Sequence, residues 1–277
     1  PLFWWETRFP APLAVVPPGA VDPRIEMGKA EVAAMLEAMP KLKSIHPFDA
    51  EAPDEEGMLL EHSFHAFFDA YADIPAYTEW MWSHDQTPAY EYLKRMLKFI
   101  QWQKRNRGET ASTGRWVLKT PHHLLGGMSG LLKVFPGVPL VMTHRDVGQV
   151  LPSYCSMCAS MSLGASMTYR REVQGAHWTS RFRTGLERFE AWRKTLPQGR
   201  IVDVRYEDTV ADPVGTAGRV MQSIGLGFDD ADRAAMEACI AANARENRPR
   251  HKYSAEEFGL TRAGIAADFA FYHDRYL

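Results

Sequence analysis

Two groups of polar residues near the middle of the chain have the types and spacing that chemistry requires. The first group is Lys119, His122 and His123, and the second is Arg145 with Ser153 eight residues further on. An imidazole with a pKa near ~6.5 suits a general base at neutral pH. A guanidinium binds two oxygens of a phosphate dianion in parallel, with stronger hydrogen bonds than neutral donors form. The chain therefore offers a candidate base beside a cation and, separately, a candidate phosphate site.

The elements that must position these two groups form a predicted β-α-β unit. Residues 116–118 and 138–143 are apolar runs of strand type, and residues 124–135 between them carry a helical apolar stripe. In open parallel sheets, ligands bind outside the carboxyl ends of the strands. We therefore expect both polar groups to face one crevice, which is the candidate active site.

Each group also has a structural interpretation. Either histidine could be a helix N-cap or a hydrogen-bonded core residue, and the sequence does not choose between this role and that of a base. Arg145 with Asp146 could be a surface strand cap with an ion pair. Pro152 removes one backbone donor and clashes with the carbonyl four residues earlier, so we expect a kink or a late start in the helix that carries Ser153.

Composition limits the class of protein. The 277 residues are 45% hydrophobic, enough for one large α/β domain or two small ones, and we favour a single domain over residues 1–277. A net charge of −2 argues against a general nucleic-acid or anionic-membrane surface. Three cysteines cannot form a full disulfide framework, which favours a reducing compartment. No apolar run approaches the roughly 20 residues that span a bilayer, so we expect a cytoplasmic protein without a transmembrane segment.

The sequence does not indicate a metal site. Cys155 and Cys158 form a lone C-x-x-C inside a predicted helix, without a second pair. His62 and His65 lie one helical turn apart, but no third ligand has a matching spacing. We therefore expect no metal cofactor.

The flanking sequence is predominantly helical. Residues 1–28 lack a sustained period and are predicted to form an extended cover that buries its aromatic side chains. A third strand is predicted at residues 201–206, and a long amphipathic helix contains residues 178–192. Further helices are predicted at about residues 29–39, 57–72, 87–104, 213–224, 230–244 and 260–276.

Two clusters in this flanking sequence have both a structural and a functional interpretation. The acidic run at residues 54–56 precedes a predicted helix, where it would act as an N-cap and complement the helix dipole; the alternative is that one of these carboxylates is a base. Tyr77, Trp80 and Trp82 form an aromatic cluster. Core packing is the default for this cluster, and a wall for an apolar acceptor is the alternative.

Taken in order along the chain, these segments resemble the sulfotransferases that use 3'-phosphoadenosine 5'-phosphosulfate, and above all their bacterial sulfotransferase-like branch. The resemblance covers nearly all of the chain and is carried by Leu118-Lys119-Thr120-Pro121-His122-His123, Arg145-Asp146 with Ser153, Arg205-Tyr206-Glu207-Asp208, His251-Lys252-Tyr253 and Glu257-Phe258-Gly259-Leu260. It implies an α/β fold of the three-layer, P-loop-like kind, with a central, mostly parallel sheet flanked by helices. A helical insertion is then expected at about residues 29–110.

The resemblance also implies roles for individual residues. His122, or failing that His123, matches the base that deprotonates the acceptor hydroxyl, and Lys119 supplies a positive charge. The donor 3'-phosphoadenosine 5'-phosphosulfate, which leaves as 3'-phosphoadenosine 5'-phosphate, is expected to contact Arg145, Ser153, Tyr206, Arg248, Arg250 and Lys252. No metal takes part in such a transfer. The expected partner is a small apolar or lipid-like molecule with a hydroxyl group, with Tyr77, Trp80 and Trp82 as its wall; the oligomeric state stays open between monomer and homo-oligomer.

One segment of the family pattern is missing from this sequence. Members of the family open with a strand and a loop that binds the 5'-phosphosulfate, whereas Pro1-Leu2-Phe3-Trp4-Trp5-Glu6 resembles the segment just after that loop. We expect that the first strand, its loop and the following helix were removed, are disordered or never belonged to this chain. Two alternatives follow: a non-catalytic homologue that binds a nucleotide or hydrophobic ligand, and, less favoured without a Gly-x-x-x-x-Gly-Lys loop, a phosphoryl-transfer enzyme.

Overall fold

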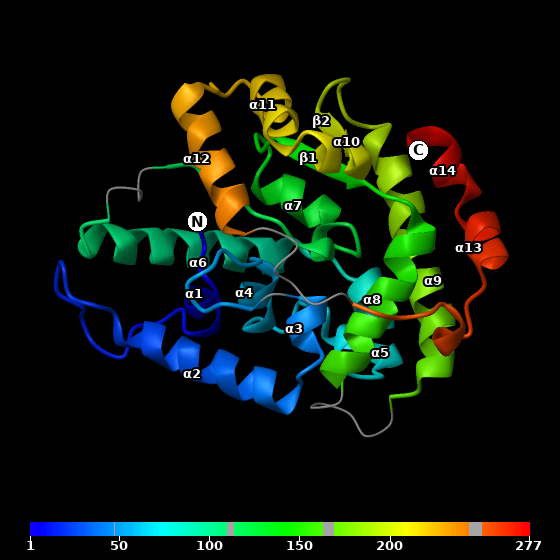
Figure 1. Cartoon of the computed structure of the whole chain (residues 1–277), viewed down its shortest axis with the longest axis horizontal. Coiled ribbons are helices and arrows are strands. Elements are labelled where there is room, and N and C mark those ends of the chain that lie inside the picture. Colours follow the sequence, from blue (N-terminus) through cyan, green and yellow to red (C-terminus); the bar gives the residue numbers. More distant parts are fainter. Residues whose placement is uncertain (47, 110–113, 163–168, 244–250) are drawn as a thin grey trace. The chain divides into compact units, whose positions relative to one another are not determined.

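A computed structural model describes residues 1–46, 48–109, 114–162, 169–243 and 251–277. The chain divides into two compact units, which are described separately. Figure 1 labels the helices and strands of both units. The first unit contains Pro1–Pro136 and Cys158–Tyr169, and the second contains Gly137–Met157 and Arg170–Leu277. The prediction of a single domain stays a prediction.

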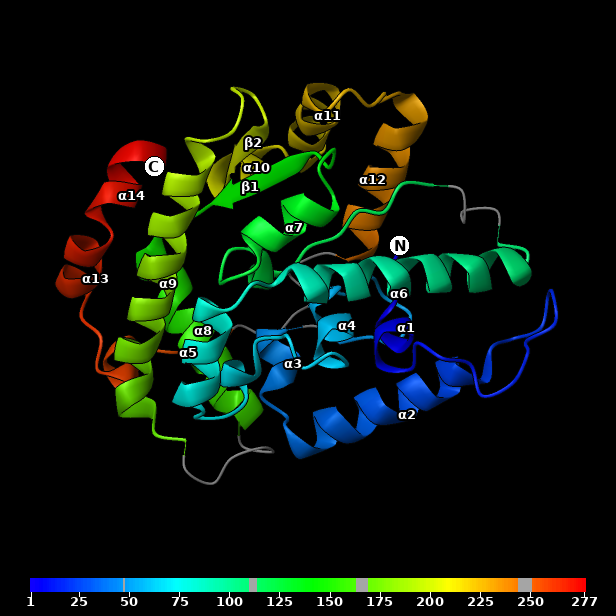
Figure 2. The ribbon, with the colours of Figure 1, turned by 180° about the vertical axis from the view of Figure 1, so that it is seen from behind.

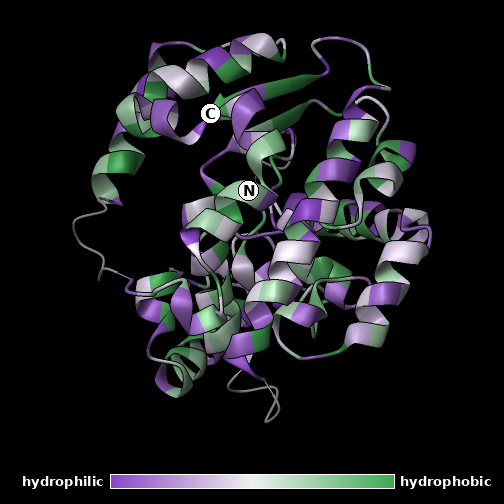
Figure 3. Ribbon diagram, turned by 90° about the vertical axis from the view of Figure 1, so that its right-hand side faces the viewer, coloured by the Kyte–Doolittle hydropathy of each residue, from purple (hydrophilic) through white to green (hydrophobic). Residues whose placement is uncertain are grey.

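The first unit consists of helices and irregular segments in the part of the chain that the structure describes. In chain order its elements are α1 (Trp4–Arg8), α2 (Pro23–Ala38), α3 (Leu42–Ile45), α4 (Gly57–Glu61), η1 (Phe68–Ala70), α5 (Pro75–Ser83), α6 (Thr87–Asn106), η3 (Pro121–His123) and α7 (Met128–Val134). Helix α6 is amphipathic, because Tyr90, Leu93, Leu97 and Ile100 recur at helical spacing and are buried. Figure 3 shows such mixed faces as helices that carry both purple and green segments.

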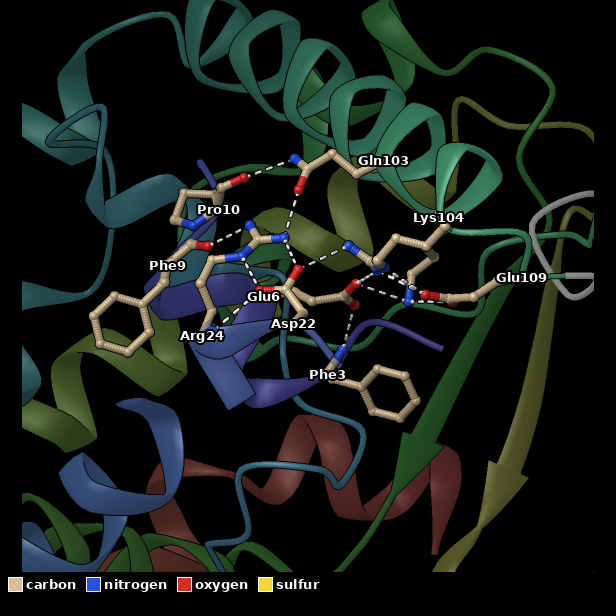
Figure 4. A network of polar contacts seen from close by, with 10 residues as sticks. Phe3, Glu6, Phe9, Pro10, Asp22, Arg24, Gln103, Lys104 and Glu109 are labelled. Carbon is tan, nitrogen blue, oxygen red and sulfur yellow. Dashed lines mark hydrogen bonds and ion pairs between the residues drawn. The ribbon is translucent and has the colours of Figure 1, made fainter. Parts of the chain in front are cut away.

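A network of buried charges ties the amino-terminal segment of this unit to α6 (Figure 4). Glu6 of α1 accepts from Lys104 Nζ at 2.8 Å and forms an ion pair with Arg107 at 3.2 Å. Asp22, the N-cap of α2, forms an ion pair with Arg24 at 2.6 Å. Burial would raise the pKa of Asp22, but hydrogen bonds from Arg24 outweigh it and lower that pKa. Buried charges require such pairing, so this network holds α1 and α2 in place.

The second unit is built around a two-stranded parallel sheet. Strand β1 (Leu140–His144) pairs with β2 (Ile201–Arg205) in a register that sets His144 opposite Arg205. The helices are α8 (Val147–Met161, whose last residues belong to the first unit), α9 (Arg171–Arg193), α10 (Tyr206–Ala211), α11 (Pro213–Ser223), α12 (Asp230–Ala242), η6 (Glu256–Phe258), α13 (Arg262–Asp268) and α14 (Ala270–Tyr276). Figure 2 shows α13 and α14 beside α9. Because the strands are parallel, the residues that follow them leave the sheet at the same edge.

Two of the predicted strands form, and one does not. The runs at 138–143 and 201–206 become β1 and β2, although Tyr206 starts α10 instead of ending the strand. The strand predicted at residues 116–118 is wrong. Residues 115–120 are irregular, and Val117 is 87% exposed. A strand exists through hydrogen bonds to a neighbouring strand, and none of the described residues pairs with this segment.

Most predicted helices form near the expected positions, with three exceptions, and the predicted extended cover at residues 1–28 also differs. The prediction of a continuous helix at 57–72 is wrong, because α4 ends at Glu61 and only a 3₁₀ turn follows at Phe68–Ala70. Residues 1–28 are not wholly extended: α1 lies within them, and α2 begins at Pro23 behind the Asp22 cap. The final helix divides into α13 and α14. The predicted helix at 124–135 is reduced to Met128–Val134.

Candidate active site

The Lys119–His123 segment of the first unit forms a capped turn. Thr120 is the N-cap of η3, where its side-chain oxygen accepts from the His122 backbone N–H at 3.4 Å. Pro121 occupies the first position, where a missing N–H has no cost. The sequence Thr-Pro-His-His therefore turns the chain directly after Lys119 and sets the two histidines on a short helical segment.

His123 is held at both ring nitrogens. Its Nε2 lies 2.8 Å from Glu56 Oε1, and its Nδ1 lies 2.8 Å from the Tyr90 hydroxyl. Since a carboxylate can only accept, Nε2 carries the proton, and Tyr90 donates to Nδ1. Burial, and next the charge of Glu56, raise the pKa of Tyr90 well above its usual value, so its hydroxyl remains a donor. His123 is thus half-buried with both ring nitrogens hydrogen-bonded, an arrangement that fits its structural interpretation.

Glu56 connects this histidine to the start of the turn. The carboxylate is fully buried, and its Oε2 accepts from the Lys119 backbone N–H at 2.8 Å. Although Glu56 is the N-cap residue of α4, its side chain makes no capping hydrogen bond. Glu56 therefore takes the predicted N-cap position, but its carboxylate does not cap the helix and binds both ends of the Lys119–His123 segment instead.

His122 and Lys119 have opposite environments. His122 is buried, and its ring centre lies 6.4 Å from that of Phe67 and 6.3 Å from that of Tyr90. The Lys119 side chain is exposed and forms an ion pair with Glu55. The turn therefore presents one imidazole in an aromatic environment and one ammonium group at the surface.

In the second unit, the sheet register places Arg145 beside Tyr206. These two residues follow the paired residues His144 and Arg205, and the Arg145 guanidinium lies 4.0 Å from the centre of the Tyr206 ring. Arg145 Nη2 also donates to Gln149 Oε1 at 3.1 Å. A cation over an aromatic face keeps its N–H groups available at the edge. The structure therefore brings two of the predicted nucleotide contacts together at one edge of the sheet.

His144 anchors this edge to the carboxyl-terminal helix. Its Nε2 bonds with Asp203 Oδ1 at 2.8 Å, and its Nδ1 bonds with the Tyr272 hydroxyl at 3.0 Å. Its ring stacks on Tyr276 with centroids 4.0 Å apart. Burial lowers the pKa of His144, although the hydrogen bond to Asp203 opposes this effect. The residue before Arg145 is therefore fixed from both sides.

Helix α8 carries polar side chains along one face. Gln149, Ser153 and Ser156 share this face because they are four and three residues apart. Ser156 bonds with His251 Nε2 at 3.0 Å, and the Tyr253 hydroxyl donates to the Gln149 carbonyl at 3.3 Å. Segment 251–253 of the predicted basic loop thus lies against α8.

Three further basic residues were predicted to contact the nucleotide, and the structure describes one of them. Lys252 is exposed. Arg248 and Arg250 lie outside the described residues.

Helix α8 starts at Val147, five residues before Pro152, so the prediction of a late helix start is wrong.

The three predicted acceptor residues lie on α5. The Tyr77 hydroxyl donates to the Ala66 carbonyl at 2.7 Å, and the Trp80 ring lies 5.8 Å from the Tyr77 ring. Tyr77, Trp80 and Trp82 are all half-buried, so the structure places them at the surface of the first unit and leaves their role as an acceptor wall a proposal.

The cysteines and other potential ligands do not form a metal site. No group of three or more His, Cys, Asp and Glu residues suitable for a metal occurs in the described part of the chain. Cys155 and Cys158 are buried free thiols, and burial raises the pKa of Cys155 to about 12. Such a thiol stays protonated and unreactive. Over the same described residues, no helix has the length and apolar character needed to cross a bilayer.

Sequence reasoning did not identify every partner in these clusters. The acidic run at residues 54–56 pointed to Glu56, but nothing in the sequence indicated that Tyr90 would contact His123. Gln149 was also missed; its position four residues after Arg145, on one helical face with Ser153, was the available signal.

Comparison with known proteins places this arrangement in a family. A profile described as "Sulfotransferase family" matches residues 7–230. No curated protein matches the chain. The solved structure of sulfotransferase STF1 from Mycobacterium tuberculosis H37Rv is similar, with 29% identity and a TM-score of 0.78 over 98% of this chain and 69% of that one.

A second similar structure is sulfotransferase STF9 from Mycobacterium avium, with 24% identity and a TM-score of 0.81 over 99% of this chain and 69% of that one. At this identity the likeness shows the fold alone. The predicted P-loop-like α/β fold and the predicted family are confirmed. The chain therefore belongs to the sulfotransferase family and is a sulfotransferase enzyme.

Proposed function

We propose that this sulfotransferase takes its sulfuryl group from 3'-phosphoadenosine 5'-phosphosulfate and transfers it to a hydroxyl of a small apolar or lipid-like molecule. The observation that carries the proposal is the Arg145 guanidinium, held over the Tyr206 ring at the end of two parallel strands. This is the place in an open α/β sheet where ligands bind.

The nucleotide end of the donor is assigned to the second unit. Arg145 binds the 3'-phosphate through parallel N–H donors, and Tyr206 supports the guanidinium plane. Ser153 lies four residues beyond Gln149, which contacts Arg145, and it adds a hydroxyl donor on the same face of α8. A cation and neutral donors suit a phosphate dianion, so the described residues fit the nucleotide. Arg248, Arg250 and Lys252 are proposed as further cations of this site.

The acceptor end is assigned to the first unit. His122 takes the acceptor's hydroxyl proton, the acceptor oxygen bonds to sulfur, and the bond from sulfur to the 5'-phosphate oxygen breaks. The products are a sulfate ester and 3'-phosphoadenosine 5'-phosphate. Lys119 offsets negative charge that develops during transfer, and no metal is required. His123 has both nitrogens engaged, so it positions the turn and is a weaker candidate for the base.

The decisive experiment measures binding and turnover in the intact protein. Addition of 3'-phosphoadenosine 5'-phosphate at about 100 times its Kd should stabilise the protein by about 2.7 kcal/mol. Arg145→Ala should abolish this stabilisation, whereas Arg219→Ala should retain it, because Arg219 lies on the exposed face of α11. Absence of stabilisation at millimolar nucleotide would contradict the proposal. Binding without turnover would favour the non-catalytic alternative.

A further inference from the structure

Arg145 lies in the short bend between β1 and α8. The strand ends at His144 and the helix begins at Val147, so only Arg145 and Asp146 join the two elements. A guanidinium recognises a phosphate through a planar set of donors, and its specificity depends on the direction of those donors. The contacts that hold this bend therefore decide how precisely Arg145 can be aimed.

On the strand side of the bend, α14 holds His144. Burial lowers the pKa of His144, so its imidazole is neutral at neutral pH. Its Nε2 then donates to Asp203 at 2.8 Å, and its Nδ1 accepts from the Tyr272 hydroxyl at 3.0 Å. Burial raises the pKa of Tyr272 to about 12, so this hydroxyl stays protonated and can donate. Tyr276, one turn further along α14, stacks on the same imidazole with the ring planes 11° apart.

On the helix side of the bend, α14 caps the first turn of α8. The first N–H groups of a helix have no partner within the helix. Here the Val147 N–H donates to His273 Nε2 at 3.3 Å, and the Gly148 N–H donates to Asp146 Oδ1 at 2.8 Å. His273 Nε2 also lies 3.5 Å from that same oxygen of Asp146. A side chain of α14 therefore supplies part of the cap that starts α8.

Helix α14 is itself fastened to α9. Arg275 Nη1 lies 2.7 Å from Glu190 Oε2, and the Tyr276 hydroxyl donates to the other oxygen of that carboxylate. The Arg193 guanidinium, three residues after Glu190, lies 5.6 Å from the centre of the Tyr276 ring. A side chain can orient its neighbour only if it is held in place itself, and these contacts hold α14.

From these contacts we propose that Tyr272 and His273 are positioning residues for the nucleotide. They hold the bend before and after Arg145, so that its guanidinium stays over the Tyr206 ring and presents its donors to the 3'-phosphate. Both side chains act through Arg145 and do not themselves contact the nucleotide. This inference rests on the proposed function, since it names the groups that orient the proposed phosphate-binding residue.

The test compares two nucleotides that differ at the 3' position. Calorimetry on the intact protein measures the Kd for 3'-phosphoadenosine 5'-phosphate and for adenosine 5'-phosphate, which lacks the group that Arg145 is proposed to bind. His273→Leu removes the acceptor of the Val147 N–H. It should raise the Kd for the first nucleotide about 10-fold, because misdirected hydrogen bonds to a charged group lose much of their strength. The Kd for adenosine 5'-phosphate should stay unchanged.

Three further variants separate positioning from a general loss of structure. Tyr272→Phe keeps the buried ring and removes only the hydroxyl, and it should have the same selective effect as His273→Leu. His273→Gln places an amide oxygen near the position of Nε2 and should restore the Kd to within about 2-fold of the wild type. The matched control is Asp274→Asn, which changes the exposed neighbour of His273 on α14 and should leave both Kd values unchanged. Urea titration establishes that each variant is folded.

The effect of His273→Leu should also depend on the guanidinium. In an Arg145→Lys background it should raise the Kd by less than about 2-fold, because an ammonium group has no planar donors to aim. An equal rise of Kd for both nucleotides in His273→Leu overturns the inference, and so does an unchanged Kd for both. A wild-type protein that does not prefer the 3'-phosphorylated nucleotide refutes the proposed function itself, and the inference falls with it.

Discussion

His123 donates from Nε2 to Oε1 of Glu56 across 2.8 Å, and the accepting carboxylate is fully buried. The same carboxylate accepts from the Lys119 backbone, so one side chain fixes the turn that carries the proposed base. Glu56→Gln exchanges one acceptor oxygen for a donor and breaks one of these hydrogen bonds. We expect a loss of about 1–3 kcal/mol in the free energy of unfolding, measured by urea titration. Glu55→Gln, at the exposed pair with Lys119, should cost less than 1 kcal/mol.

The two adjacent histidines should differ in kinetics. His122→Asn removes the proposed base and should lower kcat by about 10²–10⁴-fold. His123→Asn removes a side chain whose nitrogens both serve the turn, so it should reduce stability more than kcat. Steady-state rates and unfolding curves separate these effects. A loss of kcat in Glu55→Gln as large as that in His122→Asn would identify the carboxylate as the base.

Arg145 should matter for its shape as well as its charge. Arg145→Lys retains a cation but loses the planar, parallel donors and the stacking on Tyr206. We expect the Kd for 3'-phosphoadenosine 5'-phosphate to rise about 10-fold in the lysine variant and further in Arg145→Ala, measured by calorimetry. Equal affinity in Arg145→Lys and wild type would mean that only charge is recognised.

Stability should depend on pH through His144. Burial lowers the pKa of this imidazole from its usual 6.5, so the unfolded chain binds a proton near pH 6 that the folded chain does not. The free energy of unfolding is therefore fully retained above about pH 6.5 and falls as the pH drops below it. Burial would raise the pKa of Asp203, but the hydrogen bond from Arg193 outweighs it and keeps this pKa below 3.8. Protonation of Asp203 therefore lowers the free energy of unfolding only at a pH lower than that at which His144 acts.

Urea titrations between pH 4.5 and pH 7.5 test this dependence. In His144→Gln, the free energy of unfolding should depend less on pH than in the wild type. The residues that contact His144 remain present in this variant; they are Asp203, Tyr272 and Tyr276. His84→Gln, at an exposed histidine, should retain the wild-type slope. Identical slopes in His144→Gln and the wild type would contradict the assignment.

The buried charge network at the amino-terminal segment should be costly to break. Glu6→Gln leaves Lys104 and Arg107 with less negative charge around them in a buried setting, so we expect a loss of about 3–5 kcal/mol in the free energy of unfolding. Glu26→Gln breaks an exposed pair with Lys29 and should leave the free energy of unfolding nearly unchanged. Similar losses in both variants would show that burial of this network does not matter.

Part of the local geometry around the candidate site could be predicted from sequence because its signals are local. The Thr-Pro pair predicts a turn after Lys119, and an arginine after an apolar strand predicts an anion site at a sheet edge. The registers of β1 and β2 confirm that Arg145 and Tyr206 leave the sheet together. The helix predicted at 57–72 failed because its apolar spacing also suits a turn that directs Phe64 outward and Phe67 inward. Periodicity alone does not distinguish these outcomes.

The sequence by itself determined the family, the β1 and β2 strands and the residue types available for phosphate binding and proton transfer, because these depend on motifs and on contacts near in the chain. The tertiary structure decided which of the two histidines has both ring nitrogens engaged in hydrogen bonds. Glu56 and Tyr90 are 67 and 33 residues from His123, and only folding brings a buried carboxylate and a buried phenol to its two nitrogens. Glu56 and Tyr90 are fully buried, so their polar atoms need partners inside the protein, and the fold, not the local pattern, supplies His123 as that partner.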